Sequence, residues 1–279
     1  MRPWEAKMEL TGVWGTGSGI VIASGWRYNE AMSRYEGVIL RNGGSGWTET
    51  VSASGTNRRF QSLHGDGAGN VWIVGSATSE AAESSQDALV MHSADNGASW
   101  TEARIPLPGY NPQLFDVWAS GPNDVHAVGA AHSYTTAKGH ALRLRFDGLR
   151  WTSVVADSVS SLATVWGTGG RIFAAGHTRE SFSPDRQGLI LSSTDGGLSF
   201  QETVVAPTVG AYRMFRAAWG ASPESMYLVG TGGGILHFDG ARWEETGVGE
   251  RATLAAMWGF SARNVYALGN AGAVLHGTR

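Results

Sequence analysis

Cysteine is absent from the chain, and this absence excludes a disulfide scaffold and any metal site built from thiolates. Lysine and arginine, 21 together, are outnumbered by 24 aspartates and glutamates, and no basic block stands out. A nucleic-acid partner is therefore not expected, because phosphate backbones are bound by clustered positive charge. No apolar run approaches the length of about 20 residues that spans a bilayer as a helix, so direct membrane insertion is not expected either.

Glycine and tryptophan, by contrast, are abundant: the 279 residues include 40 glycines and 12 tryptophans. Glycine at that level indicates many tight turns, and tryptophan supplies a large apolar surface per residue. The chain has no collagen period and no low-complexity tract, so we expect a packed globular protein.

A Trp-Gly pair, or a close variant of it, recurs along the whole chain at intervals of roughly 40 to 54 residues. The six copies begin at Trp14, His64, Trp118, Trp166, Trp219 and Trp258. Each is followed by an apolar strand that ends in a glycine, which we interpret as the bend where the chain leaves the strand. A third strand, a turn and a fourth strand opened by an aromatic residue complete each copy. This period is typical of four-stranded propeller blades.

We therefore predict an all-β fold, a six-bladed β-propeller of four-stranded antiparallel blades that forms a single domain over residues 1–279. The blades are expected at about residues 10–51, 60–105, 114–155, 161–205, 214–248 and 253–279, the last completed by residues 1–8. The sixth copy stops before its fourth strand, and Trp4-Glu5-Ala6-Lys7 matches the missing piece. The N-terminal strand is thus expected to close the ring by joining the C-terminal blade, which removes exposed sheet edges.

The turns before the fourth strand carry a motif of the form Ser-x-Asp-x-Gly-x-x-aromatic. It is complete at Ser93, Asp95, Gly97 and Trp100 and again at Ser193, Asp195, Gly197 and Phe200, and shortened forms contain Asp147 and Asp239. The Asp side chain caps its own turn, the Gly accepts a positive φ, and the aromatic residue anchors the hairpin. We therefore expect these residues to serve folding and not catalysis.

This motif resembles the Asp-box, or BNR repeat, of bacterial sialidase-like propellers, and the resemblance implies a structural turn in a non-catalytic member of that superfamily. Enzymes, lectins and assembly factors share the repeat. The segment 117–129 also resembles repeats that are common in exported bacterial proteins. That resemblance implies an exported protein, periplasmic or extracellular. Residues 1–20 lack the apolar core of a signal peptide, so its leader is expected to have been removed; a cytoplasmic location is the alternative.

The connections between second and third strands, together with the links between blades, are expected on one face of the propeller. Those connections are predicted to be long loops in blades one to four, at about 26–36, 76–87, 130–139 and 177–187, and short in the last two blades. Taken singly, each residue on them is explained by packing of a loop onto its own blade, but as a group they favour a binding face. The candidate ligand-binding residues on this loop-rich face are Trp26, Arg27, Tyr28, Arg58, Arg59, Tyr110, Tyr134, His177, Arg179, Tyr212, Arg213 and Arg251, and Tyr35 lies on the first of these loops.

Three histidines, His92, His237 and His276, share one third-strand position of the repeat. Third strands lie roughly 10 Å outside the first strands of a blade, so the three side chains cannot meet at one ion, whose His ligands lie at about 2.0–2.1 Å. No metal site and no cofactor is predicted, and no catalytic residue is assigned.

Two kinds of function remain. Aromatic residues mixed with arginine can stack on a sugar or hold a protein, which favours a non-catalytic binding or scaffold propeller that recognises a glycan or protein partner. The alternative is a sialidase-like glycoside hydrolase, because Arg104-Ile105-Pro106 resembles an Arg-Ile-Pro element of that family. Here the element follows a turn motif that it precedes in sialidases. A substrate carboxylate could be held by Arg58, Arg59, Arg213 and Arg251 with a loop tyrosine. A further alternative, implied by similar propellers, is an assembly factor for a membrane complex.

Overall fold

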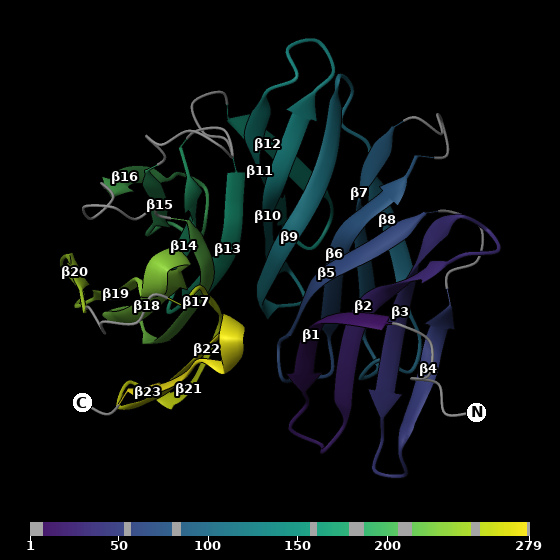
Figure 1. Ribbon diagram of the computed structural model, residues 1–279, viewed down its shortest axis with the longest axis horizontal. Coiled ribbons are helices and arrows are strands. Elements are labelled where there is room, and N and C mark those ends of the chain that lie inside the picture. Colours follow the sequence, from purple (N-terminus) through teal and green to yellow (C-terminus); the bar gives the residue numbers. More distant parts are fainter. Residues whose placement is uncertain are drawn as a thin grey trace. The chain divides into compact units, whose positions relative to one another are not determined.

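The computed structural model describes residues 8–52, 57–79, 85–156, 161–178, 187–205, 214–246 and 252–277. Nearly all of these residues lie in antiparallel strands (Figure 1). The helical elements among them are two short 3-10 turns, η1 (Thr231–Gly233) and η2 (Asn270–Gly272). No helix in the described part of the chain is long and apolar enough to span a membrane.

The strands form six sheets in the order of the sequence repeat, and the fold is that of a six-bladed β-propeller with four-stranded antiparallel blades. Blade one contains β1 (Met8–Gly15), β2 (Val21–Asn29), β3 (Arg34–Asn42) and β4 (Trp47–Ser52). Blade two contains β5 (Arg58–Gly65), β6 (Val71–Thr78), β7 (Gln86–Ser93) and β8 (Thr101–Ile105). Blade three contains β9 (Tyr110–Gly121), β10 (Asp124–Ser133), β11 (Gly139–Phe146) and β12 (Trp151–Ala156).

The remaining three blades repeat the pattern with shorter second and third strands. Blade four contains β13 (Ser161–Thr168), β14 (Arg171–His177), β15 (Gly188–Ser193) and β16 (Gln201–Val205). Blade five contains β17 (Phe215–Ser222), β18 (Ser225–Gly230), β19 (Ile235–Phe238) and β20 (Trp243–Glu245). Blade six shows β21 (Leu254–Ser261), β22 (Asn264–Gly269) and β23 (Val274–Gly277) within the described residues.

The predicted closing strand lies outside the described residues, because residues 1–7 are not among them. Ring closure through Trp4 therefore stays a prediction. Met8, which we assigned to the last blade, instead opens β1 and pairs with Arg27 of β2. Blade one therefore starts at Met8, two residues before the expected start at about residue 10.

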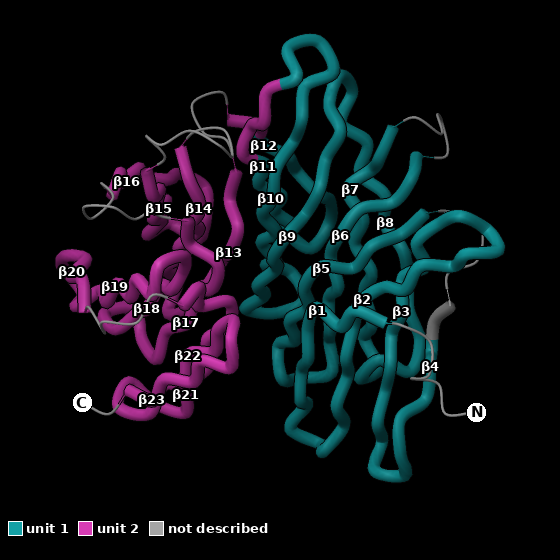
Figure 2. Tube along the Cα trace, viewed as in Figure 1, with its two compact units in different colours: residues 1–137, 142–154 teal, residues 138–141, 155–279 magenta. Residues whose placement is uncertain are grey.

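The chain divides into two compact units (Figure 2). Unit 1 comprises residues 1–137 and 142–154 and holds blades one and two and most of blade three. Unit 2 comprises residues 138–141 and 155–279 and holds blades four to six. Each unit is described by itself below, and the single domain stays a prediction.

Apolar second strands form the centre of each unit's core. In unit 1, β6 is buried along almost its whole length, and Ile73 packs with Ile22 of blade one and Leu89 of β7. In unit 2, Phe173 of β14 packs with Phe215 of the next blade. β6 reads as a continuous apolar run because blades one and three, its neighbours within unit 1, cover both of its faces.

The glycine at which we expected each second strand to end has a different role, because in blades one to three the strand continues past it, to Asn29, Thr78 and Ser133. Opposite it, the first strand carries a β-bulge, as between Leu10 and Gly12 or between Phe60 and Ser62. A Cβ added at Gly129 would lie only 1.9 Å from the carbonyl oxygen of Gln113. The equivalent distance is 1.9 to 2.5 Å at Gly25, Gly75, Gly176, Gly230 and Gly269. The close approach of a bulged neighbour, and not an exit bend, therefore requires glycine.

The motif turns are closed by their own side chains. In blade two, Ser93 donates to Asp95 at 2.7 Å and accepts the Gly97 N–H at 2.8 Å, while Asp95 accepts both the N–H and the hydroxyl of Ser99. These bonds, Ser99 first and then Ser93, lower the pKa of Asp95 to about 2. Gly97 has φ +77°, as the motif predicts.

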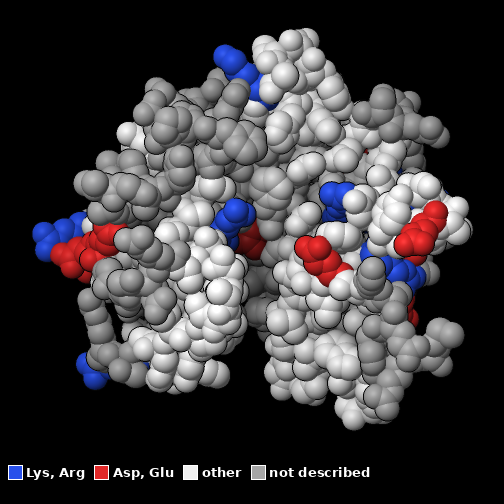
Figure 3. All heavy atoms as spheres, viewed as in Figure 1, with Lys and Arg blue, Asp and Glu red and all other residues white. Residues whose placement is uncertain are grey.

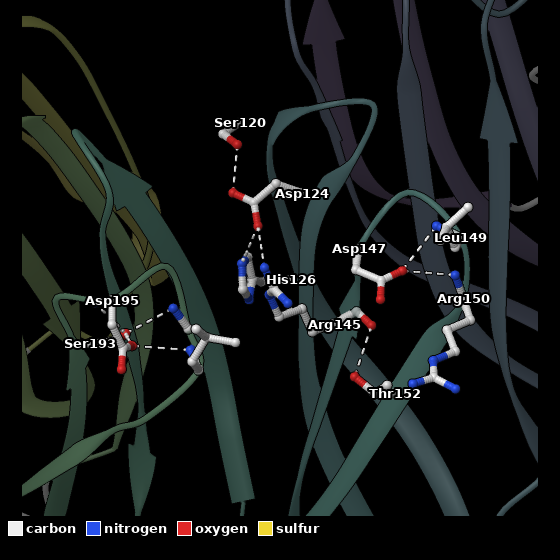
Figure 4. A network of polar contacts seen from close by, with 12 residues as sticks. Ser120, Asp124, His126, Arg145, Asp147, Leu149, Arg150, Thr152, Ser193 and Asp195 are labelled. Atoms are coloured by element: carbon white, nitrogen blue, oxygen red, sulfur yellow. Dashed lines mark hydrogen bonds and ion pairs between the residues drawn. The ribbon is translucent and has the colours of Figure 1, made fainter.

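The same arrangement recurs in blade four and, shortened, in blade three. Ser193 donates to Asp195, whose carboxylate accepts the Ser199 hydroxyl, and the pKa of Asp195 is lowered for the same reasons. In blade three, Asp147 accepts the N–H groups of Arg150 and Leu149 at 2.9 Å (Figure 4). Each carboxylate thus acts as a cap within its own turn.

Candidate functional site

The first group of predicted binding residues lies on a strand and not on a loop. β2 runs on to Asn29 and β3 starts at Arg34, so Trp26, Arg27 and Tyr28 extend the sheet of blade one. The loop prediction was wrong here, because the alternation of side chains continues past the terminal glycine. Likewise Arg58 and Arg59 lie in β5, Tyr110 in β9 and His177 in β14.

One face of this extended hairpin is aromatic. Tyr35 of β3 lies opposite Tyr28, and the two ring centroids are 5.1 Å apart with the planes at 62°. Trp26 meets Tyr35 edge-on, at 5.0 Å and 87°. The Tyr28 side chain remains 48% exposed. The hairpin also packs on β5, where a Cβ at Gly37 would lie 2.6 Å from the Phe60 ring.

Arg59 of β5 fills the corner between these rings. Its guanidinium carbon lies 3.5 Å from the ring centroid of Tyr35 and 5.4 Å from that of Trp26, a cation–π arrangement. Among the described residues, no carboxylate forms an ion pair with Arg59. The rings therefore position a cation whose charge the described part of the chain leaves uncompensated.

The opposite face of the hairpin is charged and internally paired. Arg27 bonds Glu36 and Glu49, both at 3.0 Å, and Asn29 donates to Glu36 at 2.8 Å. The amide of Asn29, followed by Arg27, lowers the pKa of Glu36. Arg27 is thus a part of the hairpin's own ion-pair network.

Two further arginines share a single glutamate beside Arg59. Arg58 contacts Glu102 at 2.7 Å, and Arg104 contacts the other oxygen of the same carboxylate at 2.6 Å. Arg104 also donates to the carbonyl oxygen of Thr78 at 2.8 Å. We call the seven residues Trp26, Tyr28, Tyr35, Arg58, Arg59, Glu102 and Arg104 the rim cluster. It contains three arginines and one carboxylate.

Charged side chains of both signs are visible over unit 1 in Figure 3, next to one another around the hairpin of β2 and β3 at the right of the view. Most of the described surface in this view is uncharged. The site is therefore a local feature of blades one and two.

The other predicted residues do not join the rim cluster. In blade three, Tyr134 is 52% exposed and its N–H donates to the carbonyl oxygen of Gly109, next to Tyr110. His177 is buried at the end of β14 in unit 2. Arg179, Tyr212, Arg213 and Arg251 lie outside the described residues. The arginine set of the hydrolase hypothesis is therefore brought together only for Arg58 and Arg59, within the described residues.

The third-strand histidines each contact the aromatic residue of the adjacent strand. His92 stacks on Trp72, with centroids 4.9 Å apart, and its Nε2 donates to the Oδ1 of Asn70 at 3.2 Å. His276 stacks on Tyr266 at 4.3 Å, and His237 lies 4.5 Å from Tyr227. These contacts lie inside single blades.

Blade three carries Arg145 at this third-strand position, and Arg145 belongs to a polar network (Figure 4). Asp124 accepts the hydroxyl of Ser120 at 2.6 Å, bonds His126 at 3.0 Å and lies 3.7 Å from Arg145. The hydrogen bond to His126 is the largest cause that lowers the Asp124 pKa. Ser120 donates to Asp124 and not to His126, so this histidine does not activate it as a nucleophile.

Comparison with known proteins shows similarity at the level of the fold. The sequence matches no family model and no curated protein. The structure is similar to the α-L-arabinanase of Penicillium chrysogenum complexed with arabinobiose, with a TM-score of 0.60 and 16% identity over 96% of this chain and 92% of that one. It is also similar to YCF48 from Cyanidioschyzon merolae, with a TM-score of 0.55 and 16% identity over 98% of this chain and 83% of that one.

A sialidase of Trypanosoma rangeli is similar as well, with a TM-score of 0.54 and 11% identity over 97% of this chain and 54% of the sialidase. At such identities the likeness shows the fold alone. The chain thus shares a β-propeller fold with these proteins, and its place in the Asp-box repeat family stays a prediction.

Proposed function

We propose that the protein is a non-catalytic binding propeller that recognises a glycan or protein partner through the rim cluster. The observation that carries this proposal is Arg59, held on the rings of Tyr35 and Trp26 without a carboxylate among the described residues. An arginine fixed by aromatic packing loses little conformational freedom when it binds, so the rim cluster is preorganised. The exposed ring of Tyr28 adds apolar contact area beside it.

The carboxylates around the rim cluster support binding over hydrolysis. A glycoside hydrolase needs one carboxylic acid that keeps its proton near neutral pH. Here Glu36 and Glu49 both bond Arg27, and Glu102 bonds two arginines. The hydrogen bonds from Asn29 and Arg27 lower the pKa of Glu36, and the ion pairs of Glu49 and Glu102 suit carboxylates that orient arginines.

The proposal is tested with a glycan array and an array of short synthetic peptides, probed with the labelled full-length protein. We expect the labelled wild-type protein to bind a subset of the array spots. The Tyr28→Ala variant should give a signal on those spots that is at least fivefold weaker. Tyr134→Ala is the matched control, because it removes an equally exposed tyrosine from blade three. Two results would count against the rim cluster: an array signal of Tyr28→Ala as strong as that of the wild type, or a signal of Tyr134→Ala as weak as that of Tyr28→Ala.

A further inference from the structure

The rim cluster has an excess of positive charge at its centre. Arg58 and Arg104 share the carboxylate of Glu102, and Arg59 has no carboxylate partner within the described residues, so the cluster as described carries three guanidinium groups and one carboxylate. The neighbouring charges on the other face of the hairpin are already paired through Arg27. A ligand with negative charge is therefore electrostatically complementary to this part of unit 1.

The ring geometry bears on the kind of ligand. A sugar stacks on an open, flat ring face, but Arg59 covers one face of Tyr35 at 3.5 Å. Trp26 and Tyr28 meet Tyr35 at 87° and 62°, so the three rings do not form a coplanar platform. The rings instead hold a planar guanidinium whose N–H edge can donate two parallel hydrogen bonds to a carboxylate.

Apolar groups lie next to the charge. Tyr28 is 48% exposed, and Met32, in the turn between β2 and β3, is 55% exposed. A ligand with carboxylates alone would leave this surface uncovered. A segment that combines carboxylates with apolar side chains would contact both parts.

From this juxtaposition we infer that the rim cluster binds an acidic peptide segment of a partner protein, with a carboxylate bound by Arg59 and an apolar side chain against Tyr28 and Met32. This inference rests on the proposed function and names the class of its ligand. Because the contact is made by charged groups at a solvated surface, its affinity falls as salt is raised.

The experiment measures fluorescence anisotropy of a labelled synthetic peptide with alternating Glu and Leu residues. Its counterpart with Gln in place of Glu removes the charge, and a galacturonate oligomer supplies carboxylates on a sugar. We expect the wild type to bind the Glu peptide with a Kd below the millimolar range, and the Gln peptide and the oligomer at least tenfold more weakly.

Variants assign the contact to Arg59. Arg59→Gln should weaken binding of the Glu peptide at least tenfold, and Arg59→Lys should weaken it less, because lysine keeps the charge but not the planar fork. Arg242→Gln is the control, since it removes one exposed arginine from unit 2 and should change the Kd less than twofold. Thermal melts establish that each variant is folded. If Arg59→Gln does not fold, the binding of the Glu peptide by Arg59→Lys tests the inference.

Three outcomes overturn the inference: no binding of the Glu peptide, equal binding of the Gln peptide, or unchanged binding by both Arg59 variants. Stronger binding of the galacturonate oligomer than of the peptide also overturns it, in favour of an acidic sugar. Loss of the array signal in Tyr28→Ala would still support the proposed binding surface in each case, so the two failures are distinguishable.

Discussion

His64 differs from its equivalents at the anchor position of the repeat, where the other five blades carry tryptophan. Its ring lies 4.6 Å from that of Trp14 and 6.4 Å from that of Trp118, and its Nδ1 accepts the N–H of Ala119 at 3.2 Å. Burial lowers the pKa of His64 to about 4, and the charge of Asp66 opposes this only in part. The neutral ring thus links blades one, two and three within unit 1.

We predict that His64 makes the stability depend on pH between about 6.5 and about 4. In this window the unfolded chain binds the proton and the folded protein does not, so the free energy of unfolding falls as the pH is lowered. The difference between the pKa of His64 in the unfolded and folded states lowers the free energy of unfolding by roughly 2 to 3 kcal/mol at about pH 4. Urea unfolding near pH 7 and near pH 4.5 measures it. His64→Gln, which keeps an acceptor for the Ala119 N–H, should show a smaller pH dependence, and an unchanged one would contradict the assignment.

At the scale of the element, the glycine that lies opposite the first-strand bulge in each blade gives a direct test. We predict that Gly129→Ala lowers the free energy of unfolding by about 3 kcal/mol or more, because the new methyl group would overlap the carbonyl oxygen of Gln113. Gly121→Ala, in β9 of the same blade, adds a Cβ with no atom within 4 Å and should cost less than about 1 kcal/mol. Chemical denaturation compares the two. Similar effects would show that the bulge does not require glycine.

The hairpin of β2 and β3 is the element that sets the candidate site. Its alternation places Trp26 and Tyr28 on the aromatic face and Arg27 with Asn29 on the charged face. This pattern is readable in the sequence as a period-2 signal that continues after Gly25, although a glycine at that position is also typical of the end of a strand. A loop was therefore predicted at about 26–36, where β2 and β3 in fact continue beyond the bulge.

At the scale of the whole molecule, the likeness to arabinanase and sialidase structures makes hydrolysis the activity to test. We predict no release of 4-methylumbelliferone from a panel of arabinosides, sialosides and other glycosides. The carboxylates of Glu36, Glu49 and Glu102 form ion pairs with arginine, and the pKa of Glu36 is lowered, whereas a general acid needs a raised one. The assay is fluorescence release at neutral and mildly acidic pH. Release that Glu36→Gln abolishes would replace the binding proposal with an enzyme.

The sequence by itself determined the six-bladed propeller, because the period, the apolar second strands and the turn motif are local patterns that repeat in register. It also indicated the hydrogen-bonding role of Asp95, since a capping carboxylate, a positive-φ glycine and an anchoring aromatic residue lie within one turn. Such features need no information about distant residues.

Only the tertiary structure decided which candidate residues act together. Arg27, Arg58 and Arg59 look alike in the sequence, yet the first two form ion pairs with glutamates and the third lies on Tyr35 and Trp26. These partners come from other strands and from another blade, so their identity depends on strand register and blade packing. Local spacing carries neither, and this is the physical reason why the fold could be predicted and the composition of the site could not.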